Sequence, residues 1–401
     1  MRILVLTNLY PPHALGGYEL SCHDTVERWR EAGHEVAVLT TATTFHDPAA
    51  DPPQPHVRRV LEWYWADHRI TRPSPRVRFE LERGNQRRLA EALAEVAPDV
   101  VSVWAMGGMS LGLLSTCVAR QVPLVAVIED DWLVYAADVD AWTGAWSRRP
   151  AWLGALVARV SGLPTRAPTL PPDAMVAFAS DYLRIRARAQ ATVGFRRSSV
   201  VPLGTDPTDF PSRRPGDRPW RGRLLTVGRV EPRKGFDIAV RALAELPDEV
   251  TLRIVGGGDE RHRGELVALA REVGVADRIG FDGLVARHDL AAVYAESDAL
   301  LFLSRWEEPF GLVPLEAMTQ AVPVVAIRRG GAAEFLADGL NCIEVPVDDP
   351  PAVAAAVRAL AGDEGLRRRL VNAGLTTSAA YRVDRFASEL EALHVAAAGG
   401  R

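Results

Sequence analysis

Short runs of apolar, often β-branched residues alternate with amphipathic segments along most of the chain. The apolar runs of the first half predict buried strands at residues 3–9, 35–40, 100–105, 123–129, 174–179 and 198–203. A helical spacing of apolar residues predicts helices over 18–32, where Gly33 ends the pattern, and over 109–120. This alternation is typical of βαβ units, so the fold class is α/β with mostly parallel sheets.

The same alternation starts again after residues 204–222, a stretch rich in Pro, Gly and Asp. The second half has predicted strands at 224–229, 251–255, 279–283, 299–304, 323–328 and 342–346, with helices between them and a helical tail from 350. The stretch 204–222 therefore has the composition of an interdomain linker. Residues 41–98 and 130–172 show no strong strand pattern and hold many of the tryptophans among clustered arginines, which is typical of functional insertions.

The composition narrows the class of protein. A chain of 401 residues with 48% hydrophobic residues exceeds one compact core and favours two domains. A formal net charge of −4 argues against a nucleic-acid partner. Cys22, Cys117 and Cys342 lack metal-site or paired spacing, and no apolar stretch reaches the ~20 residues of a membrane span. We therefore expect a reduced, cytoplasmic protein with neither an export signal nor a spanning segment.

The basic residues are almost all of one type. Of the 47 basic residues 46 are arginine, and Lys234 is the only lysine. It follows a predicted strand, together with Arg229, and precedes a predicted helix, so both cations could converge on a phosphate at the helix amino terminus. The alternatives are a solvated basic turn or a lysine left by drift.

Glycines follow two predicted strands. Gly16 and Gly17 precede the first helix, where backbone amides could approach an anion, although an ordinary turn has the same composition. Residues 256–258 are three consecutive glycines without GxGxxG spacing, so a nicotinamide dinucleotide is not indicated.

Two carboxylates bracket a further predicted strand-to-helix loop. Seven residues separate Glu308 from Glu316, which we place in the first turn of a helix starting near Val313. Glu316 could compensate the helix dipole, worth about 0.3–1 kcal/mol, or the pair could accept hydrogen bonds from vicinal hydroxyls while the backbone of residues 310–312 donates N–H groups. Cations for a diphosphate and carboxylates for polyols together predict a nucleotide-sugar site.

At this point the sequence resembles glycosyltransferase family 4, a retaining class with the GT-B fold. The similar segments include YPPHALGGYE, GHEVAVLTT, IEDDWLV, LLTVGRVEPRKGFD, VGGGDE, SRWEEPFGLVPLEAM and GGAAEFLADGLN. The resemblance implies two Rossmann-like, doubly wound domains, residues 1–204 and 205–381, facing each other across a cleft. It also implies that the last helix, about 382–397, packs back on the first domain.

The resemblance implies roles for individual residues. Arg229 and Lys234 would bind the donor diphosphate and neutralise the leaving group, and Glu308 would bind the sugar hydroxyls. The remaining donor contacts would be main-chain groups of Phe310, Gly311 and Leu312, ribose binding by Glu316, phosphate contacts from Gly16 and Gly17, and the turn at Gly283 and Leu284 near the base.

The sequence departs from the family at Glu129-Asp130-Asp131-Trp132, where many members have a His-Asp-x-Trp run. A carboxylate in place of the histidine favours a cationic or hydroxyl-rich group nearby. Our hypothesis is that Glu129, Asp130 and Trp132 line the sugar or acceptor side and face an amino sugar.

The predicted activity is metal-independent transfer of a hexose from a nucleoside-diphosphate sugar, with retention, to a small-molecule or lipid-linked acceptor in natural-product, glycolipid or polysaccharide biosynthesis. No cofactor is expected, and the DxD of Asp138 and Asp140 is not expected to bind metal. The alternatives are a nucleotide-sugar-binding regulatory subunit and, less favoured because it leaves Arg229 and Lys234 unexplained, a glycoside hydrolase using Glu308 and Glu316. Trp142, Arg148, Arg149 and Trp152 are candidates for peripheral membrane contact.

Overall fold

The computed structural model describes residues 1–45, 51–66, 69–213 and 219–399. The chain divides into two compact units, one of Met1–Pro202 with Phe386–Arg401 and one of Leu203–Arg385. The expected linker 204–222 thus belongs to the second unit, and its residues 214–218 lie outside the described part. The two units are treated separately below.

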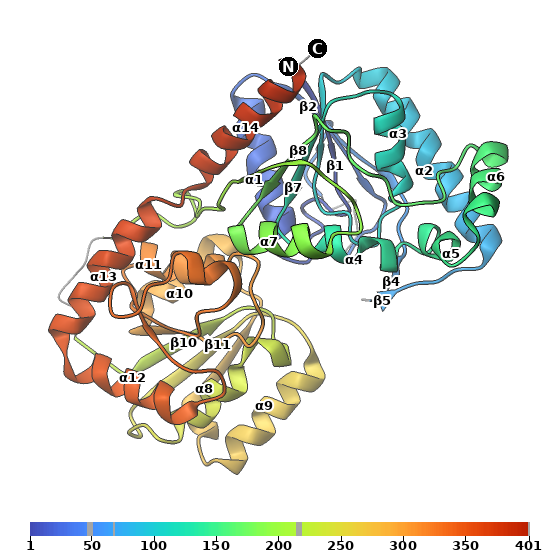
Figure 1. Cartoon of the computed structure of the whole chain (residues 1–401). Coiled ribbons are helices and arrows are strands. Elements are labelled where there is room, and N and C mark those ends of the chain that lie inside the picture. The colour runs from blue at the N-terminus through green and yellow to red at the C-terminus, as the bar shows by residue number, and fades with distance from the viewer. Residues whose placement is uncertain (46–50, 67–68, 214–218, 400–401) are drawn as a thin grey trace. The chain divides into compact units, whose positions relative to one another are not determined.

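The first unit is built on a seven-stranded parallel sheet with the order β3-β2-β1-β6-β7-β8-β9 (Figure 1). Its strands are β1 (Arg2–Leu6), β2 (Glu35–Thr41), β3 (Val57–Leu61), β6 (Val100–Val103), β7 (Leu124–Ile128), β8 (Met175–Phe178) and β9 (Arg197–Val200), beside a small hairpin of β4 (Trp65–Ala66) and β5 (Arg69–Ile70). The strand order reverses at β1 and β6, so right-handed crossovers place helices on both faces of the sheet.

Seven helices of this unit connect its strands: α1 (Gly17–Glu31), α2 (Pro75–Val96), α3 (Gly112–Ala119), α4 (Trp132–Val139), α5 (Thr143–Ser147), α6 (Ala151–Ser161) and α7 (Asp181–Gln190). The absence of strand pattern expected for 41–98 was wrong at β3, and the 22-residue helix α2 was not predicted. β3 is an edge strand of sequence VRRVL whose residues are mostly half-buried, so it lacks a buried apolar run. The first strand is also shorter than expected, ending at Leu6.

The second unit has a six-stranded parallel sheet with the order β12-β11-β10-β13-β14-β15. Its strands are β10 (Arg223–Val227), β11 (Thr251–Val255), β12 (Ile279–Gly283), β13 (Ala299–Phe302), β14 (Val324–Ala326) and β15 (Cys342–Glu344). Its α-helices are α8 (Phe236–Leu243), α9 (Glu260–Glu272), α10 (Arg287–Glu296), α11 (Leu312–Thr319), α12 (Pro350–Gly362) and α13 (Glu364–Ala379). All six predicted strands of this half and the helical tail are confirmed.

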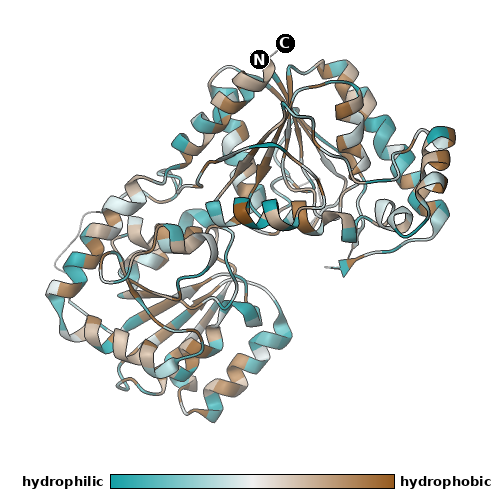
Figure 2. Ribbon diagram, in the orientation of Figure 1, coloured by the Kyte–Doolittle hydropathy of each residue, from teal (hydrophilic) through white to brown (hydrophobic). Residues whose placement is uncertain are grey.

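The hydrophobic strands form the centre of each unit, and polar residues gather on the outer helices (Figure 2). The last helix, α14 (Val383–Gly399), starts in the second unit, and from Phe386 it belongs to the first. Its residues Phe386 and Leu390 are buried, and the indole nitrogen of Trp29 donates to the carbonyl of Ala387 at 3.1 Å. Among the described residues, no helix is long and apolar enough to span a membrane.

Candidate functional site

The strand order of the second unit marks where a ligand would bind. β10 lies between β11 and β13, so the loops after β10 and β13 diverge at the point where the strand order reverses. Open parallel sheets bind ligands at this point, outside the carboxyl ends of the strands. Arg229 and Lys234 follow β10, and Glu308 follows β13.

The loop after β10 presents its two predicted site cations differently. Arg229 is half-exposed and lies 3.8 Å from Glu231, whereas Lys234 ends a short 3₁₀ turn, Pro232–Lys234. Gly235 follows with a φ of 70°, and a side chain there would collide with the carbonyl oxygen of Leu303. The loop therefore presses closely against the end of β13.

The structure brings Lys234 and Glu308 together. The Lys234 ammonium lies 2.6 Å from the Glu308 carboxylate, and the two side chains are 17% and 8% exposed. Charges withdrawn from water in this way need a partner. Each group neutralises the other, and both belong to the predicted donor site.

The loop of residues 228–235 after β10 carries the predicted phosphate-binding residues Arg229 and Lys234 and is called the phosphate loop below. The three glycines after β11 pack against it. A Cβ at Gly256 would lie 1.9 Å from the carbonyl oxygen of Gly228, and one at Gly258 would lie 2.6 Å from the backbone nitrogen and oxygen of Val230. Val230 also donates its N–H to the carbonyl of Gly257 at 2.9 Å. The lack of side chains at these glycines therefore allows the backbones of the two loops to pack against each other.

Phe310 and Gly311 lead into α11. The Phe310 ring is buried against Phe335 and Tyr381, at centroid distances of 5.4 and 5.8 Å. Its side chain thus faces the interior, so a ligand contact of Phe310 would have to come from its backbone, as predicted. Gly311 has a φ of 94°, a left-handed conformation that favours glycine, and it caps the amino end of α11.

The expected place of Glu316 in the helix was wrong. The helix begins at Leu312, so Glu316 lies in its second turn, where the dipole effect has faded. Instead the buried Tyr294 of α10 donates its hydroxyl to Glu316 Oε2 at 2.7 Å. Burial raises the pKa of Glu316, and the Tyr294 hydrogen bond partly offsets that effect. Tyr294 gave no signal in the sequence because an aromatic residue on a helix is normally core.

A hollow of about 290 Å³ lies at the carboxyl ends of β11 and β12. It is lined by Val230, Gly256, Gly257, Gly258, Asp259, Glu260, Arg263, Phe281, Gly283 and Leu284. Gly283 and Leu284, predicted to lie near the base, are thus part of a concave surface beside the phosphate loop.

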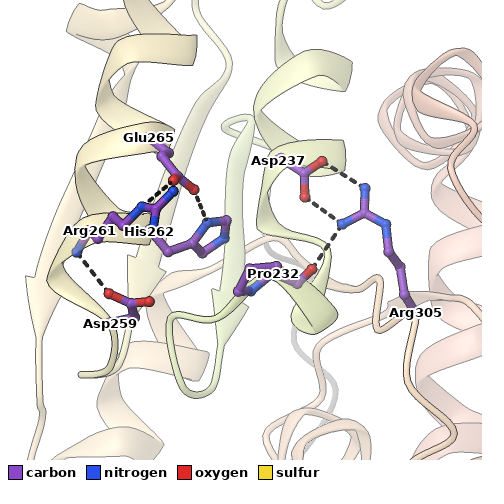
Figure 3. A network of polar contacts seen from close by, with 7 residues as sticks. All are labelled: Pro232, Asp237, Asp259, Arg261, His262, Glu265 and Arg305. Carbon is purple, nitrogen blue, oxygen red and sulfur yellow. Dashed lines mark hydrogen bonds and ion pairs between the residues drawn. The ribbon is translucent and has the colours of Figure 1, made fainter.

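Arg305 ties the phosphate loop to α8 (Figure 3). Its guanidinium donates to both carboxylate oxygens of Asp237 at 2.7 Å and to the carbonyl of Pro232 at 2.9 Å. Its backbone N–H donates to the carbonyl of Arg233 at 2.8 Å. Arg305 thus fixes the turn that carries Lys234, a role that sequence reasoning missed because one arginine among 46 carries no signal.

In the first unit, Gly16 and Gly17 precede and begin α1. Both are exposed, and no atom of the described residues lies within 4 Å of a Cβ added at either. The Gly16 N–H donates to Glu19 Oε2 at 2.9 Å, which leaves the Gly17 amide at the helix end. The surface here has room for a ligand.

Glu129 and Asp130 form a carboxyl-rich group after β7. Ser21 donates to Glu129 at 2.7 Å, and Tyr135 donates to Asp130 at 2.7 Å. Burial raises the pKa of Asp130 to about 6 and raises the pKa of Glu129 well above its ordinary range. The Glu129 carboxyl therefore favours its neutral form, which can donate a hydrogen bond as well as accept one.

Trp132 lies in the interior of the first unit. Its side chain is fully buried, and its indole nitrogen is 3.3 Å from the Tyr18 hydroxyl. On the expected sugar or acceptor side, it can therefore act only by supporting its neighbours.

The described residues contain no group of three His, Cys, Asp or Glu side chains suited to a metal ion. The DxD residues lie at the end of α4, with Asp138 in its last turn and Asp140 directly after it. Asp140 is buried and accepts hydrogen bonds from the backbone amides of Leu111, Trp142 and Thr143.

Comparison with known proteins agrees with this geometry. The family model described as Glycosyltransferase Family 4 matches residues 15–209, and the model described as Glycosyl transferases group 1 matches residues 213–376. The chain belongs to glycosyltransferase family 4. It is thus a transferase with two parallel-sheet α/β domains of GT-B type, and neither the regulatory nor the hydrolase alternative is favoured.

Relatives of this glycosyltransferase include two curated proteins. A D-inositol 3-phosphate glycosyltransferase of Xylanimonas cellulosilytica is 35% identical over 240 residues, which cover 54% of this chain and 57% of that protein. A glycogen synthase of Mycobacterium tuberculosis is 28% identical over 395 residues, covering 93% and 89%. The match to the first thus spans little more than half its length.

A solved structure has the same fold. The Anabaena protein HepE, in complex with UDP, has a TM-score of 0.69 and 20% identity, covering 98% of this chain and 99% of that one.

Proposed function

We propose that this glycosyltransferase moves a sugar with retention from a nucleoside-diphosphate sugar to an acceptor hydroxyl, without a metal ion or other cofactor. The observation that carries the proposal is the Lys234–Glu308 pair at the point where the strand order reverses. A cation for a leaving diphosphate and a carboxylate for sugar hydroxyls adjoin there.

The chemistry requires charge stabilisation at the leaving group. The anomeric C–O bond breaks through an oxocarbenium-like state while negative charge builds on the diphosphate. We assign the stabilisation of this negative charge to Lys234 and Arg229. A preorganised group of this kind typically contributes about 10²- to 10³-fold in rate. Glu308, released from Lys234 when the diphosphate binds, accepts hydrogen bonds from the sugar, and Glu316 accepts them from the ribose.

The identity of the substrates follows from chemistry and from relatives. The hollow beside Gly283 and Leu284 would take the base, and UDP is the first candidate because HepE was solved with it. The relatives named above act in inositol phosphate and glycogen chemistry, so we propose a carbohydrate or other polyhydroxylated acceptor, free or lipid-linked.

The carboxyl group at Glu129 refines the sugar side of the proposal. We keep an amino sugar, in donor or acceptor, as the favoured partner of Glu129 and Asp130. An ammonium group nearby would reverse the effect of burial and hold these carboxyls ionised. Unchanged kinetics of Glu129→Gln with both amino and neutral sugars would contradict this assignment.

The first test is thermal stabilisation by UDP, GDP, dTDP and ADP. A ligand that binds only the folded state, at 100 times its dissociation constant, raises the free energy of unfolding by about 2.7 kcal/mol. We expect one diphosphate to stabilise the wild type, and the effect to disappear in Lys234→Ala and Glu316→Ala. Arg241→Ala is the matched control, because Arg241 is an exposed cation on the neighbouring α8.

The second test is turnover with the corresponding nucleotide sugar. Release of diphosphate that depends on an added acceptor supports the transferase, and the anomeric configuration of the product tests retention. Binding without turnover would favour the regulatory alternative. Stabilisation by no diphosphate would contradict the donor site itself.

A further inference from the structure

Helix α6 exposes an apolar face. Only Gly154 of its 11 residues is buried. Trp152, Leu156 and Val160 have exposed fractions of 68%, 51% and 80%. Their spacing of four residues places them on one side of the helix. Solvent-facing helices of globular proteins normally carry polar residues there, and contiguous exposed apolar residues mark interaction sites.

The opposite face of α6 attaches it to the first unit. Val157 packs on the buried cluster of Tyr64, Leu81, Ala141, Trp142 and Leu163. Thr165 donates its hydroxyl to the carbonyl of Gly154 at 3.0 Å. The helix is therefore held in place by its inner face, so the apolar outer face is a fixed feature of the surface.

Positive charge predominates around this face. Residues 141–172 contain Arg148, Arg149, Arg159 and Arg166 and no Asp or Glu, in a chain whose formal net charge is −4. A local excess of four positive charges within an acidic protein is complementary to an anionic surface.

A basic hollow of about 370 Å³ lies beside α6. It is lined by Arg72, Arg78, Ala137, Asp138, Asp140, Ala141, Gly144, Ala145, Ser147, Arg148 and Arg149. Asp140 is occupied by backbone amides, and Arg78 donates to the carbonyl of Ala141 at 2.8 Å while its buried Nε has no hydrogen-bond partner in the described chain. The hollow also contains the exposed Asp138, but its four guanidinium groups outnumber its two carboxylates and suit a phosphate group.

We propose that the outer face of α6 and the adjoining arginine hollow dock this enzyme on an anionic lipid bilayer. The side chains of Trp152, Leu156 and Val160 enter the interface between headgroups and acyl chains, and the arginines bind lipid phosphates. The helix is about 16 Å long, so it lies on the membrane and does not cross it. Trp142, a candidate for membrane contact in the sequence, is buried and supports α6 from below.

The test is flotation of the whole chain with vesicles, without donor or acceptor. Its result therefore does not depend on the proposed transferase activity. We expect binding to vesicles of phosphatidylcholine with phosphatidylglycerol, weaker binding at high salt, and little binding to phosphatidylcholine alone.

Two double variants separate the apolar and basic contributions. Trp152→Ser with Leu156→Ser should abolish flotation. Arg148→Gln with Arg149→Gln should lower the partition coefficient about 30-fold, the equivalent of about 1 kcal/mol for each arginine. The matched controls are Ile185→Ser, an equally exposed apolar residue on α7, and Arg241→Gln; both should bind as the wild type does.

Three results would overturn the proposal. The first is a wild type that does not float with anionic vesicles or that binds neutral vesicles equally well. The second is wild-type binding by both α6 variants. The third is a dimer in sedimentation velocity that the Trp152 and Leu156 substitutions dissociate, since a second copy of the chain would then cover the face.

Discussion

Lys234 and Glu308 neutralise each other at 2.6 Å. In the proposed function, a diphosphate that takes over the ammonium leaves the Glu308 carboxylate free for the sugar. The proposal therefore predicts that binding of the two halves of the donor is coupled through this ion pair. An arginine at position 234 would keep the charge but would replace a compact ammonium by a planar guanidinium, which offers a physical reason for the one lysine in a chain that otherwise uses arginine.

Tyr294→Phe tests how Glu316 is held. The substitution keeps the buried ring but removes the hydroxyl that donates to Glu316 at 2.7 Å. Losing the partner of a partly buried carboxyl costs about 1–3 kcal/mol, so we expect diphosphate affinity to fall about 10- to 100-fold with little change in kcat. Titration of the diphosphate by calorimetry measures it, with Phe210→Leu as a packing control, since Phe210 lies edge-on to Tyr294. Wild-type affinity would show that Glu316 does not need this hydrogen bond.

Glu82 makes the stability of the first unit depend on pH. It is fully buried, and its carboxyl accepts hydrogen bonds from Tyr64 at 2.6 Å and from Ser110. Burial raises the pKa of Glu82, with the nearby Asp140 adding to the rise. The folded state therefore binds the proton more tightly than the unfolded state. Its contribution to stability is fully present below the unfolded pKa, near 4.3, and is lost as pH rises.

We therefore expect the free energy of unfolding to fall between pH 5 and 8, by up to about 1.4 kcal/mol per pH unit for this group. Glu82→Gln removes the titratable group, and like a protonated carboxyl it offers one acceptor oxygen and one donor to Tyr64 and Ser110, so it should flatten the slope. Denaturant unfolding across this range measures the effect. Glu80→Gln, an exposed residue of the same helix, is the control and should retain the wild-type slope. Equal slopes in Glu82→Gln and the wild type would contradict the assignment.

At the scale of elements, the phosphate loop depends on its attachment to β13 and α8. Arg305→Lys keeps a positive charge but cannot span both Asp237 oxygens and the Pro232 carbonyl. We expect a loss of about 1–3 kcal/mol in stability and about tenfold or more in diphosphate affinity, because the turn carrying Lys234 loosens. Thermal unfolding with and without diphosphate measures both. Arg261→Lys, in an exposed ion pair on α9, should change neither quantity, and undiminished affinity in Arg305→Lys would exclude a positioning role.

The sequence predicted secondary structure well where a single physical requirement, such as burial on both faces, determines the residue type. Central parallel strands are buried on both faces, so their apolar runs were predicted across both units. Strand β3 is half-covered, and α2 is a largely polar helix whose buried side chains include Glu82 and Asn85, so neither shows a clear period.

Lys234 and Glu308 could be singled out because a strand end followed by a helix is visible in the sequence, and the structure places the two side chains together. Their role in binding the donor stays a prediction. The contacts of Tyr294 and Arg305 depend on tertiary packing and could not be predicted. Trp132 and Trp142 show the converse limit, because a tryptophan in an unpatterned segment can be a surface or a core residue, and both are core.

At the scale of the whole molecule, the chain enters the second unit after Pro202 and returns to the first at Phe386. The first unit is therefore completed by residues that follow the whole of the second unit in the chain. Phe386 faces Trp104 at a centroid distance of 6.3 Å, and His394 faces Trp29 at 4.7 Å. The first unit is thus discontinuous in sequence and depends on α14 for part of its core, whereas the second unit is one continuous stretch of chain.

Phe386→Ala with Leu390→Ala should therefore destabilise only the first unit. Each truncation of a buried Phe or Leu costs about 3 kcal/mol, and the sum approaches the stability of a typical domain. We expect calorimetry to resolve two transitions, with the first-unit transition lowered or absent. Added diphosphate should still raise the other transition, because Lys234, Glu308 and Glu316 all lie in the second unit. Val395→Ser, an exposed position of the same helix, should leave both transitions in place. A single transition that falls as a whole would show instead that the two units unfold together, and it would assign α14 to the stability of both.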